Sequence, residues 1–229
     1  MKKAIRIIGI IVVIGLIGAA IFTSMTVKPS SRDKVWDEAT TVGNLDAKNY
    51  FVVYSDIMCP YCVAFENAIL EHQEEFEKYI EQNDILLEIR MSDFLYEYGE
   101  AQAINSRYSA EATYCAKREG KFWDYYDMAI ATVWNGYFKS GGKAAFTELN
   151  KVGKDFWIGL GEEIGLGETF MNCVKNDESL SEVEDTAAKM AKVAHGMPYF
   201  KFNDFATSGF DLSWGWEYVL MYFDSGLKS

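Results

Sequence analysis

Two cysteines, Cys59 and Cys62, are separated by two residues and stand at the start of a segment with helical periodicity. Paired thiols at this spacing can close into a disulfide and open again, which suits them to thiol-disulfide exchange. The unpartnered N–H groups and the dipole at a helix N-terminus favour an anion, and the thiolate is the reactive form of cysteine. Pro60 in the first turn costs the helix no hydrogen bond. The pattern therefore indicates a redox dithiol.

The other two cysteines, Cys115 and Cys173, lie far apart in the chain. Four cysteines in an exported protein permit three disulfide pairings, so a static structural clip between Cys59 and Cys62 stays open as an alternative. A zinc site is a further alternative, but Cys115 and Cys173 lack the second paired spacing that zinc ribbons show. We expect a redox pair and no metal site.

Pro198 is the second element of the pattern, and the chain has only three prolines. A bond before proline adopts the cis form at modest cost. A cis-proline beside a dithiol would leave the backbone of the preceding residue, Met197, free to pair with an extended peptide. A trans proline that starts a strand is the alternative.

The dithiol requires a strand and a helix to hold it, and the flanking sequence supplies both. Residues 50–54 are β-branched or aromatic, as is typical of a buried strand, and residues 56–58 form a turn. One long helix follows, with glutamates on its outer face. Its apolar face carries Phe65, Ile69, Phe76 and Ile80. Residues 85–91 predict a second strand and complete a β-α-β start.

Residues 96–192 have a helical pattern in which glycines mark the turns. The helical stretches are 101–118, 121–134, 143–149, 168–175 and an apolar stripe over 180–193. The predicted turns fall at Gly120, Gly136, Gly141, Gly142 and Gly153. Strands return at 199–202 and 207–210, and a helix over 214–223 closes the chain. We expect an α/β sheet domain interrupted by an all-helical insertion.

The N-terminus has the pattern of an export signal. Three basic residues precede an uncharged apolar run over residues 7–22. At about 1.5 Å per residue, residues 7–27 cover about 31 Å, close to the hydrocarbon thickness of a bilayer. Residues 1–27 are therefore expected to be a membrane anchor or, because Gly18 and Ala20 are small, a cleavable signal segment. The basic residues place the N-terminus in the cytoplasm and the rest of the chain outside.

Composition narrows the class of protein further. The chain contains 49% hydrophobic and 15% aromatic residues, which is typical of a globular protein. Its net charge of -12 and pI near 4.7 argue against a nucleic-acid-binding protein, which normally presents a basic face. Residues 28–40 are polar and predict a tether.

Four segments, taken in order, resemble the successive motifs of the DsbA-like thiol-disulfide oxidoreductases. They are Thr41–Ala47, Tyr54–Cys62, Cys115–Trp123 and Gly196–Phe200. The resemblance runs from about Thr41 to the C-terminus. It implies a thioredoxin fold in which residues 41–95 and 179–229 form the sheet domain and residues 96–178 form the helical insertion.

The resemblance implies roles for single residues and an activity. Cys59 is the nucleophile, Cys62 the buried resolving thiol and Pro198 the cis-proline. The activity is that of a bacterial enzyme outside the cytoplasm, which donates disulfides to reduced exported proteins without a bound cofactor. A membrane quinone-linked partner reoxidises it.

Localisation and direction depend on features that the resemblance leaves open. With the anchor retained, the protein is a single-pass protein of the bacterial cell membrane, with its N-terminus cytoplasmic and its catalytic domain outside. With the leader cleaved, it is secreted. The alternatives in function are a reductase or isomerase of the same fold, and a non-catalytic exported scaffold or metal chaperone.

Some positions depart from the DsbA pattern. Tyr61 stands where DsbA has a histidine, and because tyrosine carries no positive charge we expect a milder oxidant. Met197 stands where relatives often have threonine or valine, which leaves the substrate preference open. Val53 stands where DsbA has a buried acid. Glu66 does match an acid of DsbA; it shares a helical face with Cys62 and is expected either to relay protons or to face solvent.

Cys115 and Cys173 both fall in the helical insertion. The resemblance implies a structural disulfide between them, which would stabilise the fold by roughly 4 kcal/mol in the chain-entropy model. Two free buried thiols are the alternative. An aromatic cluster in the same insertion is expected to pack in the core rather than to form a binding box. It consists of Phe122, Trp123, Tyr125 and Tyr126.

Overall fold

The computed structural model describes residues 37–98 and 103–229. The membrane anchor or signal segment predicted over residues 1–27 lies outside the described residues, as does most of the predicted tether. Among the helices of the described ranges, none has both the length and the apolar character that a membrane span requires. A short 3-10 helix, η1 (Glu38–Thr40), leads into the first strand.

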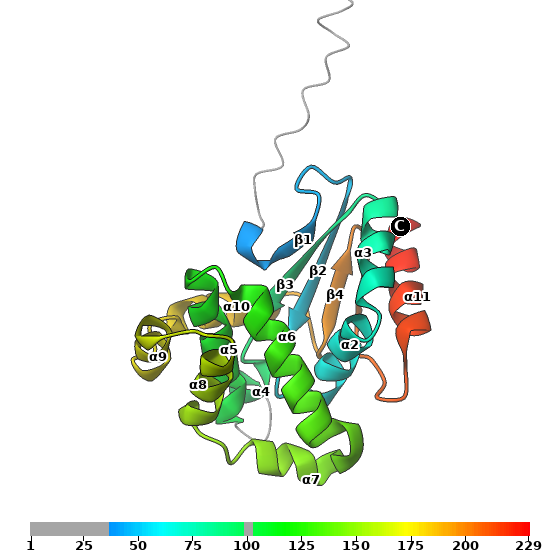
Figure 1. The fold of residues 1–229 in the computed structure, drawn as a ribbon. Helices are drawn as coiled ribbons and strands as arrows, with labels where there is room; N and C mark the ends of the chain where they lie inside the picture. Colours follow the sequence, from blue (N-terminus) through cyan, green and yellow to red (C-terminus); the bar gives the residue numbers. More distant parts are fainter. Residues whose placement is uncertain (1–36, 99–102) are drawn as a thin grey trace, which may run out of the picture. The chain divides into compact units, whose positions relative to one another are not determined.

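Five strands form one sheet in the order β1-β3-β2-β4-β5 (Figure 1). The central strands β2 (Asn49–Ser55) and β3 (Ile85–Met91) run parallel, with Val53 opposite Ile89. The other strands, which are antiparallel to their neighbours, are β1 (Thr41–Gly43), β4 (Tyr199–Phe202) and β5 (Phe205–Ser208). Helices fill the chain between β3 and β4, so the predicted α/β sheet with a helical insertion is confirmed.

The central strands lie where the sequence predicts them because they are covered on both faces. Every residue from Phe51 to Ser55 is buried, so β2 is a continuous apolar run rather than an alternating one. The three-residue strand β1 is too short to produce a pattern and was not predicted. The strand predicted over 207–210 begins two residues earlier, at Phe205.

Helices α2 (Pro60–Leu70), α3 (Gln73–Gln82) and α11 (Trp216–Leu227) lie together on one side of the sheet (Figure 1). The prediction of one long helix after the dithiol was wrong, since the chain turns between α2 and α3. Phe76 keeps the helical spacing of seven residues from Ile69 across this break, so the apolar pattern could not reveal it. The closing helix begins and ends later than the predicted 214–223.

The segment between β3 and β4 is helical wherever it is regular. Its helices are α4 (Phe94–Glu97), α5 (Ile104–Arg118), α6 (Phe122–Val133), α7 (Lys139–Leu149), α8 (Lys154–Glu163), α9 (Glu168–Lys175) and α10 (Leu180–Met190). A π-helical segment, Trp134–Phe138, joins α6 to α7 without a turn. The turns predicted at Gly136, Gly141 and Gly142 were therefore wrong: the chain stays helical there, and Phe138 is buried against the core.

Helix α8 was not predicted, and its glycines explain why. A side chain at Gly161 would place Cβ 2.1 Å from Cε1 of Phe170 on α9. The glycine thus permits close approach of two helices, whereas in the sequence it suggests a break.

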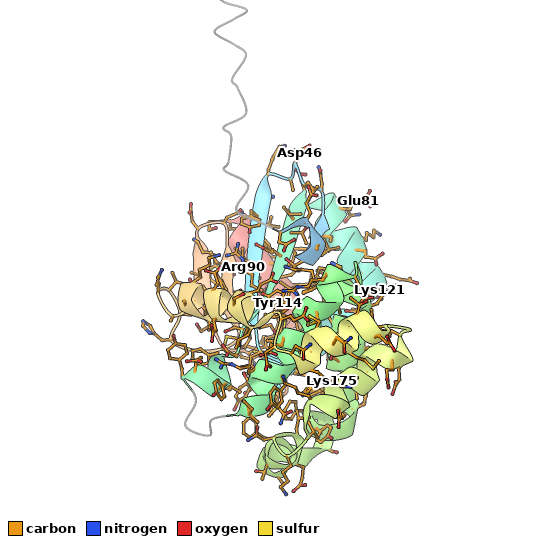
Figure 2. All side chains as sticks on the ribbon, turned by 90° about the vertical axis from the view of Figure 1, so that its left-hand side faces the viewer. Asp46, Glu81, Arg90, Tyr114, Lys121 and Lys175 are labelled. Carbon is orange, nitrogen blue, oxygen red and sulfur yellow. A yellow bond between two sulfur atoms is a disulfide. The ribbon has the colours of Figure 1, made fainter. Side chains whose placement is uncertain are left out.

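Tyr114, on α5, joins the helical segment to the sheet (Figure 2). Its buried hydroxyl donates to the carbonyl of Met91 and accepts from the N–H of the same residue, both at 3.1 Å. The Thr186 hydroxyl on α10 lies 3.1 Å away. These contacts hold α5 and α10 against the C-terminal end of β3, beside which the dithiol lies.

Candidate active site

Cys59 and Cys62 lie where β2 gives way to α2. Cys59 is the N-cap residue and Pro60 is the first residue of the helix. The first intrahelical hydrogen bond runs from the Val63 N–H to the Cys59 carbonyl, at 3.1 Å. The N–H groups of Tyr61 and Cys62 precede this bond and have no partner within the helix.

The two thiols differ in exposure and in chemistry. Both are free cysteines, and Cys59 is 4% exposed whereas Cys62 is fully buried. Tyr61, between the cysteines, is 46% exposed. Burial raises the pKa of Cys62 well above its usual range, and its contact with Cys59 and the charge of Asp56 raise this pKa further. Cys62 therefore holds its proton more tightly than an ordinary thiol does.

Asp56 holds the loop in which the dithiol stands. Its carboxylate accepts from the N–H of Met58 at 2.9 Å, from the N–H of Leu95 at 2.9 Å and from the hydroxyl of Ser106 at 2.6 Å. Its carbonyl accepts from the Cys59 N–H at 2.9 Å. Burial raises the pKa of Asp56 to about 6, against the effect of these hydrogen bonds. From the sequence alone, Asp56 is predicted only to be part of a turn.

Glu66 lies one helical turn beyond Cys62 and is 5% exposed, so the solvent-facing alternative was wrong. Burial raises its pKa to about 8; the nearby Tyr126 hydroxyl opposes the rise and the charge of Asp127 adds to it. Among the described residues, Oε1 of Glu66 has no hydrogen-bond partner. The burial follows from α6, which carries Tyr126 and packs across α2.

The acids near the dithiol do not come from the sheet position that DsbA uses. Val53, which stands at that position, is fully buried and apolar. The buried carboxyl groups near Cys62 come instead from Asp56, before α2, and Glu66, within it. Asp56 is the functional residue that sequence reasoning missed. The available signal was the position of Asp56 in the turn. An aspartate in a turn often accepts a hydrogen bond from the N–H two residues later, here that of Met58.

The Met197–Pro198 peptide bond is cis. Met197 and Tyr199 are buried in the same apolar cluster as Cys59 and Cys62. The Pro198 carbonyl accepts from the Gly209 N–H at 2.8 Å, which ties the start of β4 to the end of β5. The structure thus brings the residues around Pro198, more than a hundred positions away in sequence, to the dithiol.

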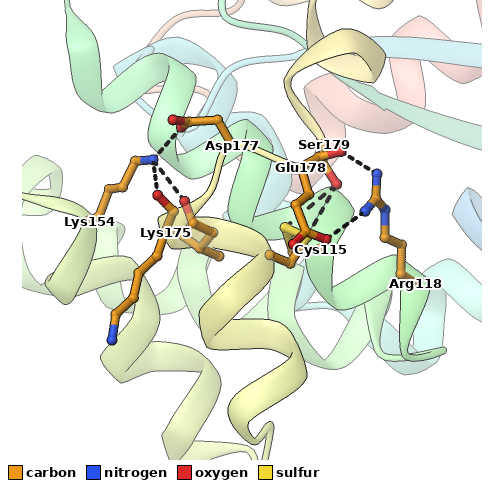
Figure 3. The surroundings of a disulfide bond; sticks show 9 residues. Cys115, Arg118, Lys154, Lys175, Asp177, Glu178 and Ser179 are labelled. Atoms are coloured by element: carbon orange, nitrogen blue, oxygen red, sulfur yellow. Dashed lines mark hydrogen bonds and ion pairs between the residues drawn. A yellow bond between two sulfur atoms is a disulfide. The ribbon is translucent and has the colours of Figure 1, made fainter.

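A disulfide joins Cys115 on α5 to Cys173 on α9, with the two Cα atoms 5.8 Å apart (Figure 3). The Ser179 hydroxyl lies 3.5 Å from Cys115 Sγ and 3.6 Å from Cys173 Sγ. Next to the disulfide, the ammonium of Lys154 on α8 donates to the carbonyl of Val174, the residue that follows Cys173, at 2.8 Å. Both cysteines of this disulfide belong to the helical segment.

The aromatic cluster of the insertion packs mainly in the core, as predicted. Phe122, Tyr125 and Tyr126 are at most 2% exposed, and Trp123 is half-buried. Within the described ranges, no group of three or more cysteine, histidine or acidic side chains is placed to hold a metal ion.

Comparison with known proteins gives one family match. A model of the thioredoxin family matches residues 37–204. No curated protein matches the sequence.

Solved structures with the same fold come from several bacteria. A thioredoxin-like oxidoreductase from Silicibacter pomeroyi has a TM-score of 0.57 and 21% identity, covering 87% of this chain and 99% of that one. BdbD from Bacillus subtilis, in its oxidised form, has a TM-score of 0.56 and 16% identity, covering 83% and 93%. The protein alpha-DsbA1 from Wolbachia pipientis has a TM-score of 0.57 and 14% identity, covering 82% and 90%.

Proposed function

Because this chain belongs to the thioredoxin family and has the fold of DsbA-like proteins, we propose that it exchanges disulfides with exported proteins through Cys59 and Cys62. The observation that carries the proposal is the difference between the two thiols. Cys59 caps the helix and retains some exposed surface, whereas Cys62 is fully buried with a raised pKa. One sulfur is thus placed for attack and the other for release.

We propose that the reaction runs from the oxidised form, in which Cys59 and Cys62 are joined. A client thiolate attacks Cys59 Sγ and the bond to Cys62 breaks, so that Cys62 leaves as a thiolate and takes up a proton. A second client thiolate then attacks the client sulfur of the mixed disulfide and releases Cys59 as a thiolate. Two electrons pass from the client to the dithiol.

Glu66 is the proposed source of the proton for Cys62. The two residues share one face of α2, and Tyr126 lies close enough to both to feel their charges. With a pKa raised to about 8, the Glu66 carboxyl holds a proton at neutral pH and can give it up.

The client is proposed to lie in an extended form beside Met197. Met197 shares an apolar cluster with Cys59, so a segment bound along its backbone would present a cysteine to the exposed edge of Cys59. Pro198 holds the start of β4 at this position through its bond to Gly209.

The proposed location is outside the cytoplasm, with residues 1–27 as a membrane anchor and residues 28–40 as a tether. The disulfide between Cys115 and Cys173 supports this, because such bonds persist in oxidising compartments. Residues 41–95 and 179–229 are proposed as the thioredoxin-like part and 96–178 as the insertion. A membrane quinone-linked protein is the proposed reoxidising partner.

The direction of exchange is tested by the reduction potential of the Cys59–Cys62 pair. Potentials of about -120 mV mark strong disulfide donors and about -270 mV mark reductants. We expect a value above about -250 mV, together with oxidation of a model dithiol peptide. A lower potential with rapid insulin reduction would make the protein a reductase, and failure in both assays would leave a non-catalytic scaffold.

The roles of the two thiols are tested by single substitutions. Cys59→Ser is expected to abolish exchange. Cys62→Ser, mixed with the disulfide form of the peptide, is expected to accumulate a mixed disulfide on a non-reducing gel, because the Cys59 thiolate displaces one peptide thiolate and no second thiol of the protein can release the peptide. The reverse pattern would contradict the assignment of Cys59 as the attacked sulfur.

A further inference from the structure

A cavity opens between β1, α2, α3 and α6, and none of its lining residues belongs to the dithiol loop. Its mouth has a volume of about 240 Å³, and its apolar walls include Val42, Leu70, Phe76 and Trp123. A smaller chamber of about 30 Å³ shares these walls and extends to Glu66 and Tyr126. The mouth is large enough for a small organic molecule, whereas the inner chamber suits a single polar group or water.

The ionisable side chains that line this cavity are all acidic. Glu66 lines the inner chamber, Glu77 lines the mouth and Asp127 lines both. Among the described residues that line the two spaces, none is a lysine or an arginine. Glu77 accepts a hydrogen bond from the Gln73 side chain at 3.1 Å. Within the described part of the chain, no ion pair is formed by Asp127 or Glu66.

Glu66 gives the cavity an unsatisfied acceptor. Its side chain is buried, it lines the inner chamber, and its Oε1 lacks a hydrogen-bond partner among the described residues. A donor placed in the chamber would satisfy this acceptor. A cationic donor would also pair with the carboxylate of Asp127, which lines the same chamber.

We propose that this cavity binds a small organic cation, with its ammonium group between Glu66 and Asp127 and its apolar body between Phe76 and Trp123. The apolar walls account for the body of the ligand, Asp127 accounts for its charge, and Oε1 of Glu66 accepts a hydrogen bond from it. The aromatic rings of Phe76 and Trp123 suit a flat or cationic group. The inference goes beyond the proposed disulfide exchange and does not depend on its direction.

The probe is 2-phenylethylamine, titrated into the full-length protein by calorimetry. The matched neutral probe is 2-phenylethanol, which has the same body with a hydroxyl in place of the ammonium. We expect the amine to bind about 10-fold more tightly, as one charge-assisted contact would give. Equal affinity for the two probes, or no binding of the amine, would overturn the proposal.

Two variants locate the binding site. Asp127→Asn should weaken the amine about 10-fold and leave the alcohol unchanged, because it removes charge and little volume. Gln73→Trp, at an exposed position on the mouth, should block both probes without disturbing the core. Glu81→Gln, on the exposed surface of the same helix α3, is the matched control and should bind as the wild type does. Amine binding that survives both Asp127→Asn and Gln73→Trp would place the site elsewhere and refute the assignment.

Discussion

The carboxylate of Asp56 accepts a 2.6 Å hydrogen bond from the hydroxyl of Ser106, which lies 50 residues later in the chain. Both groups are fully buried. The contact joins the loop that carries the dithiol to helix α5 of the insertion. The helical segment therefore does more than cover the sheet, since it fixes the residue that shapes the loop before Cys59.

Removing this contact should destabilise the fold. Asp56→Asn replaces one acceptor oxygen with an amide nitrogen, so a buried N–H of Met58 or Leu95 loses its partner, at a cost of about 1–3 kcal/mol. Ser106→Ala removes a single hydrogen bond and should cost about 1 kcal/mol. Urea denaturation at constant pH measures both. Ser181→Ala, an exposed serine on α10, is the control and should lie within about 0.5 kcal/mol of the wild type. An unfolding free energy of Asp56→Asn equally close to that of the wild type would contradict the role of Asp56.

The disulfide of the insertion should matter for stability and not for exchange. Replacing Cys115 and Cys173 together by serine should lower the unfolding free energy by roughly 4 kcal/mol, because the bond closes a long loop in the unfolded chain. Peptide oxidation per folded molecule should be unchanged. A loss of exchange in protein shown to be folded by circular dichroism would mean that the second pair takes part in the reaction.

Much of the fold could be predicted because the decisive residues are local. Strand β3 and helix α9 have the predicted bounds. A mainly apolar run specifies the strand, and an apolar stripe specifies the helix. The break between α2 and α3 could not be predicted, because Ile69 and Phe76 keep their spacing through it. Gly161 was misleading for a different reason: its role depends on Phe170 of the next helix.

The candidate site also has features that the local sequence predicts and features that depend on distant parts of the chain. The spacing of Cys59 and Cys62 and their place at a helix start are local, and the sequence predicts them. The role of Asp56 depends on partners 39 and 50 residues away, so its own neighbours carry little sign of it. Whether Glu66 faces solvent or the interior depends on where α6 packs, which no periodicity within α2 can decide.

Tyr61 should set the strength of the protein as an oxidant. Tyr61→His places a group that can carry positive charge beside Cys59, at a position that is 46% exposed. A stabilised thiolate favours the reduced form. The reduction potential should therefore rise by about 30 mV for each tenfold gain in the equilibrium constant for reduction of the Cys59–Cys62 disulfide. Equilibration with a glutathione buffer measures it. Tyr61→Phe keeps the ring without a charge and is the matched control; a potential for Tyr61→His no higher than that of Tyr61→Phe would contradict the prediction.

Glu66 should make stability depend on pH. Its pKa is raised from 4.5 to about 8 by burial, so the folded protein binds this proton more tightly than the unfolded chain does. The stability that this group contributes is complete below pH 4.5 and is lost as the pH rises through about 8. Asp56 and Asp127 also have raised pKa values, each of about 6, so the effect of Glu66 must be isolated by difference.

Glu66→Gln keeps the shape of the side chain and removes the titration. The unfolding free energy of the wild type minus that of Glu66→Gln should fall between pH 5 and 8, by at most about 1.4 kcal/mol per pH unit. Denaturation series at several pH values measure this difference. Glu81→Gln, at an exposed position on α3, is the matched control for loss of a carboxylate. A difference between wild type and Glu66→Gln that stays constant over this range would show that Glu66 is not held as a buried acid, and the proposed proton relay to Cys62 would lose its source.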